Sequence, residues 1–215
     1  MNKILLLVAV CSCVLTTFSQ SLITDDTIFL KKGIYKTFDE FRHNSPSIPM
    51  EYEVLWGKIM YGGLEGIYND TLYNLKIDKT KAKQIGNVWG FCDGKNIYIN
   101  MQASMKRSKV TGNSVKVFKP ISQFDKLFYL GRYCYFTTGQ YGGSGGVFPH
   151  HWVCALDFNT GKELFLDRVA MKKILEKDEE LLQAYKDENK FGRDDEAYYK
   201  FLQLYSEKHK DEIIR

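Results

Sequence analysis

The segment VWGFCDGKNIYI, residues 88–99, is the clearest local indication of how this chain folds. Apolar and aromatic residues lie on both sides of the Asp93-Gly94 pair. This pair favours a tight turn, because glycine tolerates the positive φ that such turns need. The segment therefore predicts a β-hairpin and, with it, an antiparallel sheet.

Other strand-like runs lie on either side of this hairpin. They are rich in Tyr, Phe, Val and Ile and are separated by Gly, Asn and Asp, which is typical of half-buried strands. We interpret residues 54–61 as one strand and residues 72–77 as a second, followed by a basic turn. Residues 127–136 are predicted to form one long strand with Gly131 as a bulge or bend.

In the glycine-rich segment GQYGGSGGVFPHHWVC, residues 139–154, the glycine run lies between two predicted strands, residues 133–137 and 151–158. It lacks the GxxxxGK[ST] spacing of a phosphate-binding loop, and no helix is predicted after it. We therefore interpret it as a loop that joins antiparallel strands. Because loops on a rigid sheet often carry binding functions, this one is our candidate ligand-binding loop. Its candidate ligand-binding residues are Tyr141, His151 and Trp152.

A short helix is predicted near the start of the sheet. Thr37 and Glu40 have the spacing of a capping box, in which each side chain satisfies a backbone N–H of the first turn. The helix should end by Asn44, because Pro46 and Pro49 disfavour its continuation.

The pattern becomes helical after residue 166. Asp167 and Asp178 are placed to cap two helices, and a last helix carries an apolar stripe at i, i+3, i+4 and i+7. The stripe consists of Tyr198, Phe201, Leu202 and Tyr205. The charged residues around it are interpreted as a solvated outer face.

These elements predict a single α+β domain over residues 20–215, mainly β over 27–166 and helical over 167–211. Its architecture is expected to be an antiparallel β-sheet or partial barrel with a short N-terminal helix and C-terminal helices.

The first 19 residues have the pattern of a secretory signal peptide. Lys3 is followed by an apolar run over residues 4–15 and then by small residues, which favours cleavage between Ser19 and Gln20. The alternative is a lipoprotein signal with a lipid anchor at Cys13, but apolar residues follow that cysteine where polar ones are usual. The apolar run is shorter than the roughly 20 residues that a membrane span needs. We expect an exported protein: periplasmic, at the outer-membrane surface or secreted.

Charge and cysteine content narrow the interpretation further. The formal net charge of +4 is too small and too scattered to indicate nucleic-acid binding. Three cysteines, Cys92, Cys134 and Cys154, lie outside the predicted signal peptide, so at most one internal disulfide can form. Cys134 and Cys154 are the candidate pair because they fall on neighbouring predicted strands, and buried free thiols are the alternative.

No residue set predicts catalysis or a cofactor. His150, His151 and Cys154 resemble a metal cluster, but adjacent histidines on a strand point to opposite faces. The sequence around Ser144 lacks the GxSxG frame of a nucleophile elbow. The alternative left open is a hydrolase or isomerase whose site is assembled only in the fold. The residues considered for that site are Asp93, Asp157 and His151.

Residues 33–46 and the hairpin at 88–99 together resemble a family of small exported proteins of unknown function from Gram-negative bacteria. Members of that family pair a GIY…F.EF..N.PS start with a WGF.DGK..YI hairpin and end in acidic helices. The resemblance implies export and a shared fold, and it supplies no activity. The resulting hypothesis is a non-catalytic binding or structural module of the bacterial cell envelope, whose partner is an unknown protein, peptide or glycan.

Overall fold

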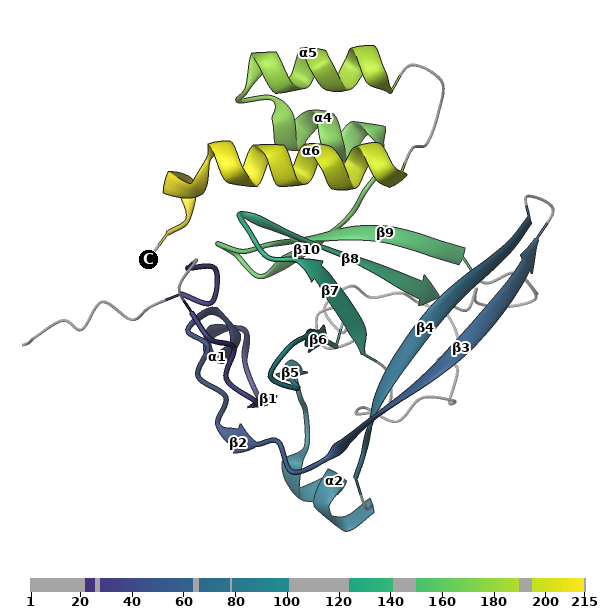
Figure 1. Ribbon diagram of the computed structural model, residues 1–215, viewed down its shortest axis with the longest axis vertical. Coiled ribbons are helices and arrows are strands. Elements are labelled where there is room, and N and C mark those ends of the chain that lie inside the picture. The colour runs from purple at the N-terminus through teal and green to yellow at the C-terminus, as the bar shows by residue number, and fades with distance from the viewer. Residues whose placement is uncertain are drawn as a thin grey trace, which may run out of the picture.

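The computed structural model describes residues 22–25, 28–63, 66–77, 79–100, 124–140, 150–189 and 195–214. An antiparallel sheet of eight strands forms its body (Figure 1). The strands are β1 (Gly33–Tyr35), β2 (Ile48–Pro49), β5 (Gly90–Cys92), β6 (Ile97–Ile99), β7 (Asp125–Tyr129), β8 (Tyr133–Gln140), β9 (His150–Asp157) and β10 (Lys162–Phe165). Their order is β10-β9-β8-β7-β6-β5-β1-β2, so the sheet is open and not closed into a barrel. The predicted α+β class is confirmed.

The predicted hairpin at residues 88–99 is confirmed as β5 and β6. Cys92 faces Ile97 across a four-residue turn in which Gly94 has a φ of 97°. The Asp93 carboxylate closes the turn by accepting hydrogen bonds from the N–H groups of Lys95 and Asn96, at 2.8 and 2.7 Å.

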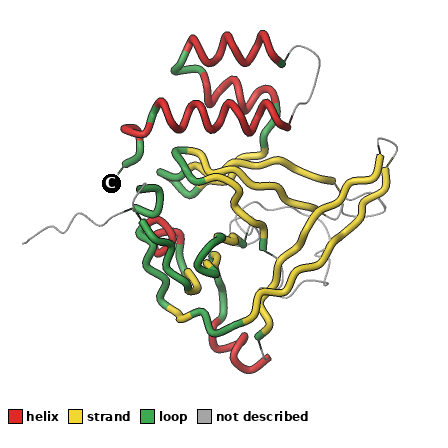
Figure 2. Tube along the Cα trace, viewed as in Figure 1, coloured by secondary structure: helices red, strands yellow, loops and turns green. Residues whose placement is uncertain are grey.

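The helices lie mostly at one end of the chain and on one face of the sheet (Figures 1 and 2). They are α4 (Arg168–Leu175), α5 (Glu179–Glu188) and α6 (Asp195–Lys208), followed by the short 3₁₀ turn η1 (Lys210–Glu212). The predicted caps are confirmed, because Asp167 accepts from the N–H of Ala170 and Asp178 from that of Leu181. All four residues of the predicted α6 stripe are buried.

Alternation along β8 and β9 separates two cores. Tyr135, Val153 and Ala155 point toward α4, α5 and α6 and form the helix-side core with them. Their neighbours Phe136 and Leu156 point the other way, into a second core that also contains Leu22, Tyr35 and Phe41. We call it the N-terminal-side core. Thus one sheet region carries a buried layer on each face.

The N-terminal-side core includes the predicted helix α1 (Phe38–Arg42). The N–H of Glu40 donates to the Thr37 hydroxyl at 3.1 Å, which confirms the cap. The reciprocal half of the capping box is shifted by one residue, because the Glu40 carboxylate accepts from the N–H of Lys36 and not from that of Thr37.

Strands β3 (Glu53–Gly63) and β4 (Gly66–Lys76) form a separate two-stranded ribbon that extends away from the sheet (Figure 1). β3 confirms the interpretation of residues 54–61, and β4 confirms that of 72–77 up to Lys76. The expected basic turn after them is the helix α2 (Lys79–Ile85). That prediction was wrong because the run consists largely of residues with good helix propensity. The C-terminal end of α2 is also stabilised by a residue distant in sequence, because the Lys36 amine donates a hydrogen bond to the carbonyl of Ile85.

The prediction of one long strand over residues 127–136 was also wrong. β7 and β8 are two antiparallel strands, and Gly131 lies in the turn between them. A Cβ on Gly131 would lie 2.8 Å from the Cβ of Ser206 in α6, so only glycine lets the turn approach the helix. This contact is tertiary, and local sequence patterns do not contain it.

Among the described residues, none of the helices combines the length and the apolar character needed to cross a bilayer.

Candidate functional site

Strand β7 contains a β-bulge at Phe128. Leu127 pairs with Phe136 and Tyr129 pairs with Tyr135, so Phe128 is one residue more than β8 supplies. The extra residue reverses the alternation of side chains. Leu127 therefore belongs to the N-terminal-side core, whereas Tyr129 packs on the helix-side core, and the ring of Phe128 is left 51% exposed.

The sheet forks beside this bulge. The ladder between β6 and β7 has two pairs, Tyr98 with Lys126 and Ile99 with Asp125. The next position of each strand, Ile97 in β6 and Leu127 in β7, has no pair across this ladder. Among the described strands, Ile97 pairs only with β5 and Leu127 only with β8. A bulged strand bends locally, and this explains why β7 leaves β6 at this point.

A groove with a volume of about 360 Å³ lies at the fork, and we call it the fork groove. It is lined by Leu30, Lys95, Asn96, Ile97, Lys126, Leu127, Phe128, Tyr129 and Leu130. Its size is at the lower end of the roughly 300–1,000 Å³ of ligand pockets.

The two charged residues that line the groove, Lys95 and Lys126, are both cations. The nearby carboxylate of Asp93 is already engaged by its own turn and by the hydroxyl of Tyr98, at 3.1 Å. Burial alone would raise the pKa of Asp93, but hydrogen bonds from Asn96, Lys95 and Tyr98 outweigh it and lower that pKa. The charge that the lining residues offer to a ligand is therefore positive.

The floor of the groove is apolar and firmly packed. Ile97 and Leu127 are buried members of the N-terminal-side core, and Leu30 and Leu130 pack against that core. Among the described residues that line the groove there is no carboxylate, histidine, cysteine or serine. The arrangement can hold an anionic ligand that also has an apolar part, and the side chains in its lining that carry an amine or a phenol are Lys95, Lys126 and Tyr129.

Of the three sequence-based candidates, only Trp152 is described with its side chain. Tyr141 lies outside the described residues, and His151 is described only as a position of β9 that faces Gly139. Trp152 is half-buried against the N-terminal-side core, with its ring centroid 5.3 Å from that of Phe165. Trp152 is not among the described residues that line the fork groove.

The strands on both sides of the glycine-rich segment are antiparallel, as predicted. β8 ends and β9 begins with the pair Gln140 and His150, so the chain leaves the segment as a strand. Residues 141–149 themselves lie outside the described residues.

The three cysteines Cys92, Cys134 and Cys154 are free and buried. Cys134 faces Leu156 and Cys154 faces Phe136, so Cys134 and Cys154 are diagonal neighbours and not an opposite pair. Diagonal positions are typically about 7–8 Å apart, beyond the usual Cα separation of a disulfide. Burial raises the pKa of the Cys134 thiol to about 12, so this thiol is not a nucleophile at neutral pH.

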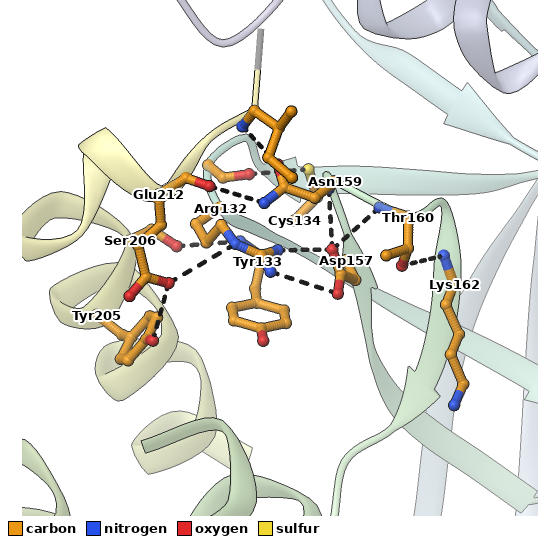
Figure 3. A network of polar contacts seen from close by, with 12 residues as sticks. Arg132, Tyr133, Cys134, Asp157, Asn159, Thr160, Lys162, Tyr205, Ser206 and Glu212 are labelled. Carbon is orange, nitrogen blue, oxygen red and sulfur yellow. Dashed lines mark hydrogen bonds and ion pairs between the residues drawn. The ribbon is translucent and has the colours of Figure 1, made fainter. Parts of the chain in front are cut away.

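Asp157, considered for a catalytic site, belongs to a structural network (Figure 3). Its carboxylate accepts a hydrogen bond from Nη1 of Arg132 at 2.6 Å and another from the N–H of Asn159 at 2.9 Å. The Asn159 amide group donates to the carbonyl of Glu212 and accepts from the N–H of Ile214. The network thus fastens the C-terminal turn to the turn between β9 and β10.

Asp93 and Asp157 are therefore held by different elements and by different partners. Neither lines the fork groove. Within the described parts of the chain, no group of three or more His, Cys, Asp or Glu residues is arranged to hold a metal ion.

Sequence reasoning missed Lys126 and Phe128. The signal that could have indicated a bulge is the run of four large apolar residues at 127–130, because such a run cannot alternate between a core face and a solvent face. Lys95 stood in the hairpin motif, but nothing local connects it with Lys126.

A family model described as a family of unknown function (DUF6563) matches residues 33–209. No curated protein and no solved structure matches the chain. The match agrees with the expectation of an uncharacterised family and supplies no activity.

Proposed function

This chain belongs to the family of unknown function DUF6563, and from that premise we propose that it is an exported, non-catalytic binding module. It holds an anionic ligand with an apolar part in the fork groove. The observation that carries the proposal is the pair Lys95 and Lys126 beside an apolar floor.

Binding is favoured over catalysis because the carboxylates and the thiol considered for catalysis have structural roles or are buried. The carboxylates of Asp93 and Asp157 each accept several hydrogen bonds that hold turns. The buried Cys134 thiol has a pKa that keeps it protonated. The groove, in contrast, combines a rigid apolar surface with cationic side chains, which is the composition of a recognition site.

The proposed signal cleavage is compatible with the packing of the described residues. Leu22 is 1% exposed and belongs to the N-terminal-side core. Cleavage between Ser19 and Gln20 would leave Leu22 and all later described residues in the mature protein. The proposed location is the periplasm, the outer-membrane surface or the medium.

A fluorescent aromatic sulfonate, 8-anilinonaphthalene-1-sulfonate, provides a probe with an apolar part and one negative charge. We expect saturable binding to the folded protein. In the double variant Lys95→Glu/Lys126→Glu the dissociation constant should rise about tenfold, because charge attraction is replaced by repulsion. Fluorescence titration measures both constants.

The matched control is Lys172→Glu/Lys173→Glu, which makes the same change of charge at exposed positions of α4. This control should bind the probe like the unmodified protein. An equal loss of affinity in both double variants, or no saturable binding at all, would refute the proposal.

A further inference from the structure

We infer that the ligand of the fork groove is an acidic peptide segment of a partner protein, bound in extended conformation as an added strand. This inference rests on the proposed function and specifies the class of its ligand. The residues that carry it are Lys95, Lys126 and the strand positions between them.

The first support is the backbone at the fork. β6 and β7 stop pairing after Tyr98 and Lys126; beyond this pair β6 supplies one more strand residue, Ile97, and β7 continues over residues 127–129. Ile97 and Leu127 have their described ladder partners on the far side from the groove. Strand edges of this kind accept an extended peptide through main-chain hydrogen bonds, and side-chain contacts then add specificity.

The second support is the spacing of the two cations. Lys126 faces Tyr98, and Lys95 precedes Tyr98 by three residues. The two lysines are therefore at most about 10 Å apart along the strand direction. In an extended peptide, residues i and i+2 lie on the same side about 6.5–7 Å apart, a spacing that two flexible lysine side chains can reach.

The residue between two such acidic positions points the opposite way, toward the apolar floor formed by Ile97 and Leu127. The recognised pattern is thus acidic–apolar–acidic in a strand. A glycan has no regular series of backbone N–H donors to match a strand edge. A lipid surface is broad and flat, whereas these lysines flank a groove.

The test uses a fluorescein-labelled octapeptide of alternating Glu and Val and measures fluorescence anisotropy. We expect saturable binding that is weakened about tenfold or more in Lys95→Glu/Lys126→Glu and unchanged in Lys172→Glu/Lys173→Glu.

A second peptide, which tests the main-chain hydrogen bonds, carries N-methyl groups on the alternate backbone amides that lie along one edge of the extended peptide. A third peptide carries N-methyl groups on the backbone amides along the other edge. One of these two should bind about tenfold more weakly than the parent peptide, because its strand hydrogen bonds are lost.

Equal binding of all three peptides would overturn added-strand recognition. If the sulfonate probe binds saturably but the peptide does not bind, the inference that the ligand is a peptide is overturned. The proposed function is then left intact. The peptide class would also be overturned if vesicles of phosphatidylglycerol or an oligouronate, and not the peptide, lose affinity in the groove variant. If neither the probe nor the peptide binds the unmodified protein saturably, both proposals are refuted.

Discussion

Replacing Phe41 by alanine should lower the free energy of unfolding by about 3–5 kcal/mol. Phe41 is 0% exposed, and its ring stacks on Trp89 with centroids 4.5 Å apart. It also meets Phe158 edge-on, at 5.9 Å. The loss is large because removal of the ring leaves a cavity at the point where α1 attaches to the sheet. Urea unfolding followed by circular dichroism measures the change.

The matched control is Phe29→Ala. It removes the same side chain at a position that is 92% exposed, so it should change stability by less than about 0.5 kcal/mol. Similar losses for both variants would show that the packing of α1 on the sheet is not as described.

The second large effect concerns Asp178, which caps α5 and is 5% exposed. Burial alone would raise its pKa, but hydrogen bonds from His209 at 2.9 Å, the N–H of Leu181 and Lys208 outweigh it and lower the pKa to about 2. A folded-state pKa below the unfolded value contributes stability above the unfolded pKa. That stability is lost as pH falls from about 4 through 2.

Asp178→Asn should therefore destabilise the protein by about 2 kcal/mol at pH 6–7. Asparagine is also a good N-cap, so the loss of stability in this variant comes mainly from removal of the negative charge. The difference from the unmodified protein should shrink steadily below pH 4. Chemical unfolding at a series of pH values measures it.

The control for this variant is Glu180→Gln. Glu180 also accepts a hydrogen bond from Lys208, but its side chain is exposed, so its loss should cost less than about 0.5 kcal/mol. A pH-independent penalty for Asp178→Asn would contradict the assignment of a charge-dependent contribution to Asp178.

Features with a local cause were predictable from the sequence. Thr37, Asp167 and Asp178 cap helices because their side chains reach N–H groups three residues later. The Asp93-Gly94 turn and the buried stripe of α6 follow from equally short-range rules.

Features with a tertiary cause were not predictable in this way. Gly131 forms a turn and not a bulge because α6 approaches it closely. Phe128 is the bulged residue because Leu127 and Tyr129 must serve cores on opposite faces. The fork groove depends on that bulge and on two lysines that are 31 positions apart in the chain, Lys95 and Lys126. No single stretch of sequence contains this combination.

The central claim is that ligands bind where β6 and β7 part. The most direct test is a ¹H–¹⁵N correlation spectrum recorded during titration with the aromatic sulfonate. Our account predicts that the largest shift changes occur at the amides of residues 95–97 and 126–130. Changes confined to β9 near Trp152, with the amides of the fork groove unmoved, would contradict it.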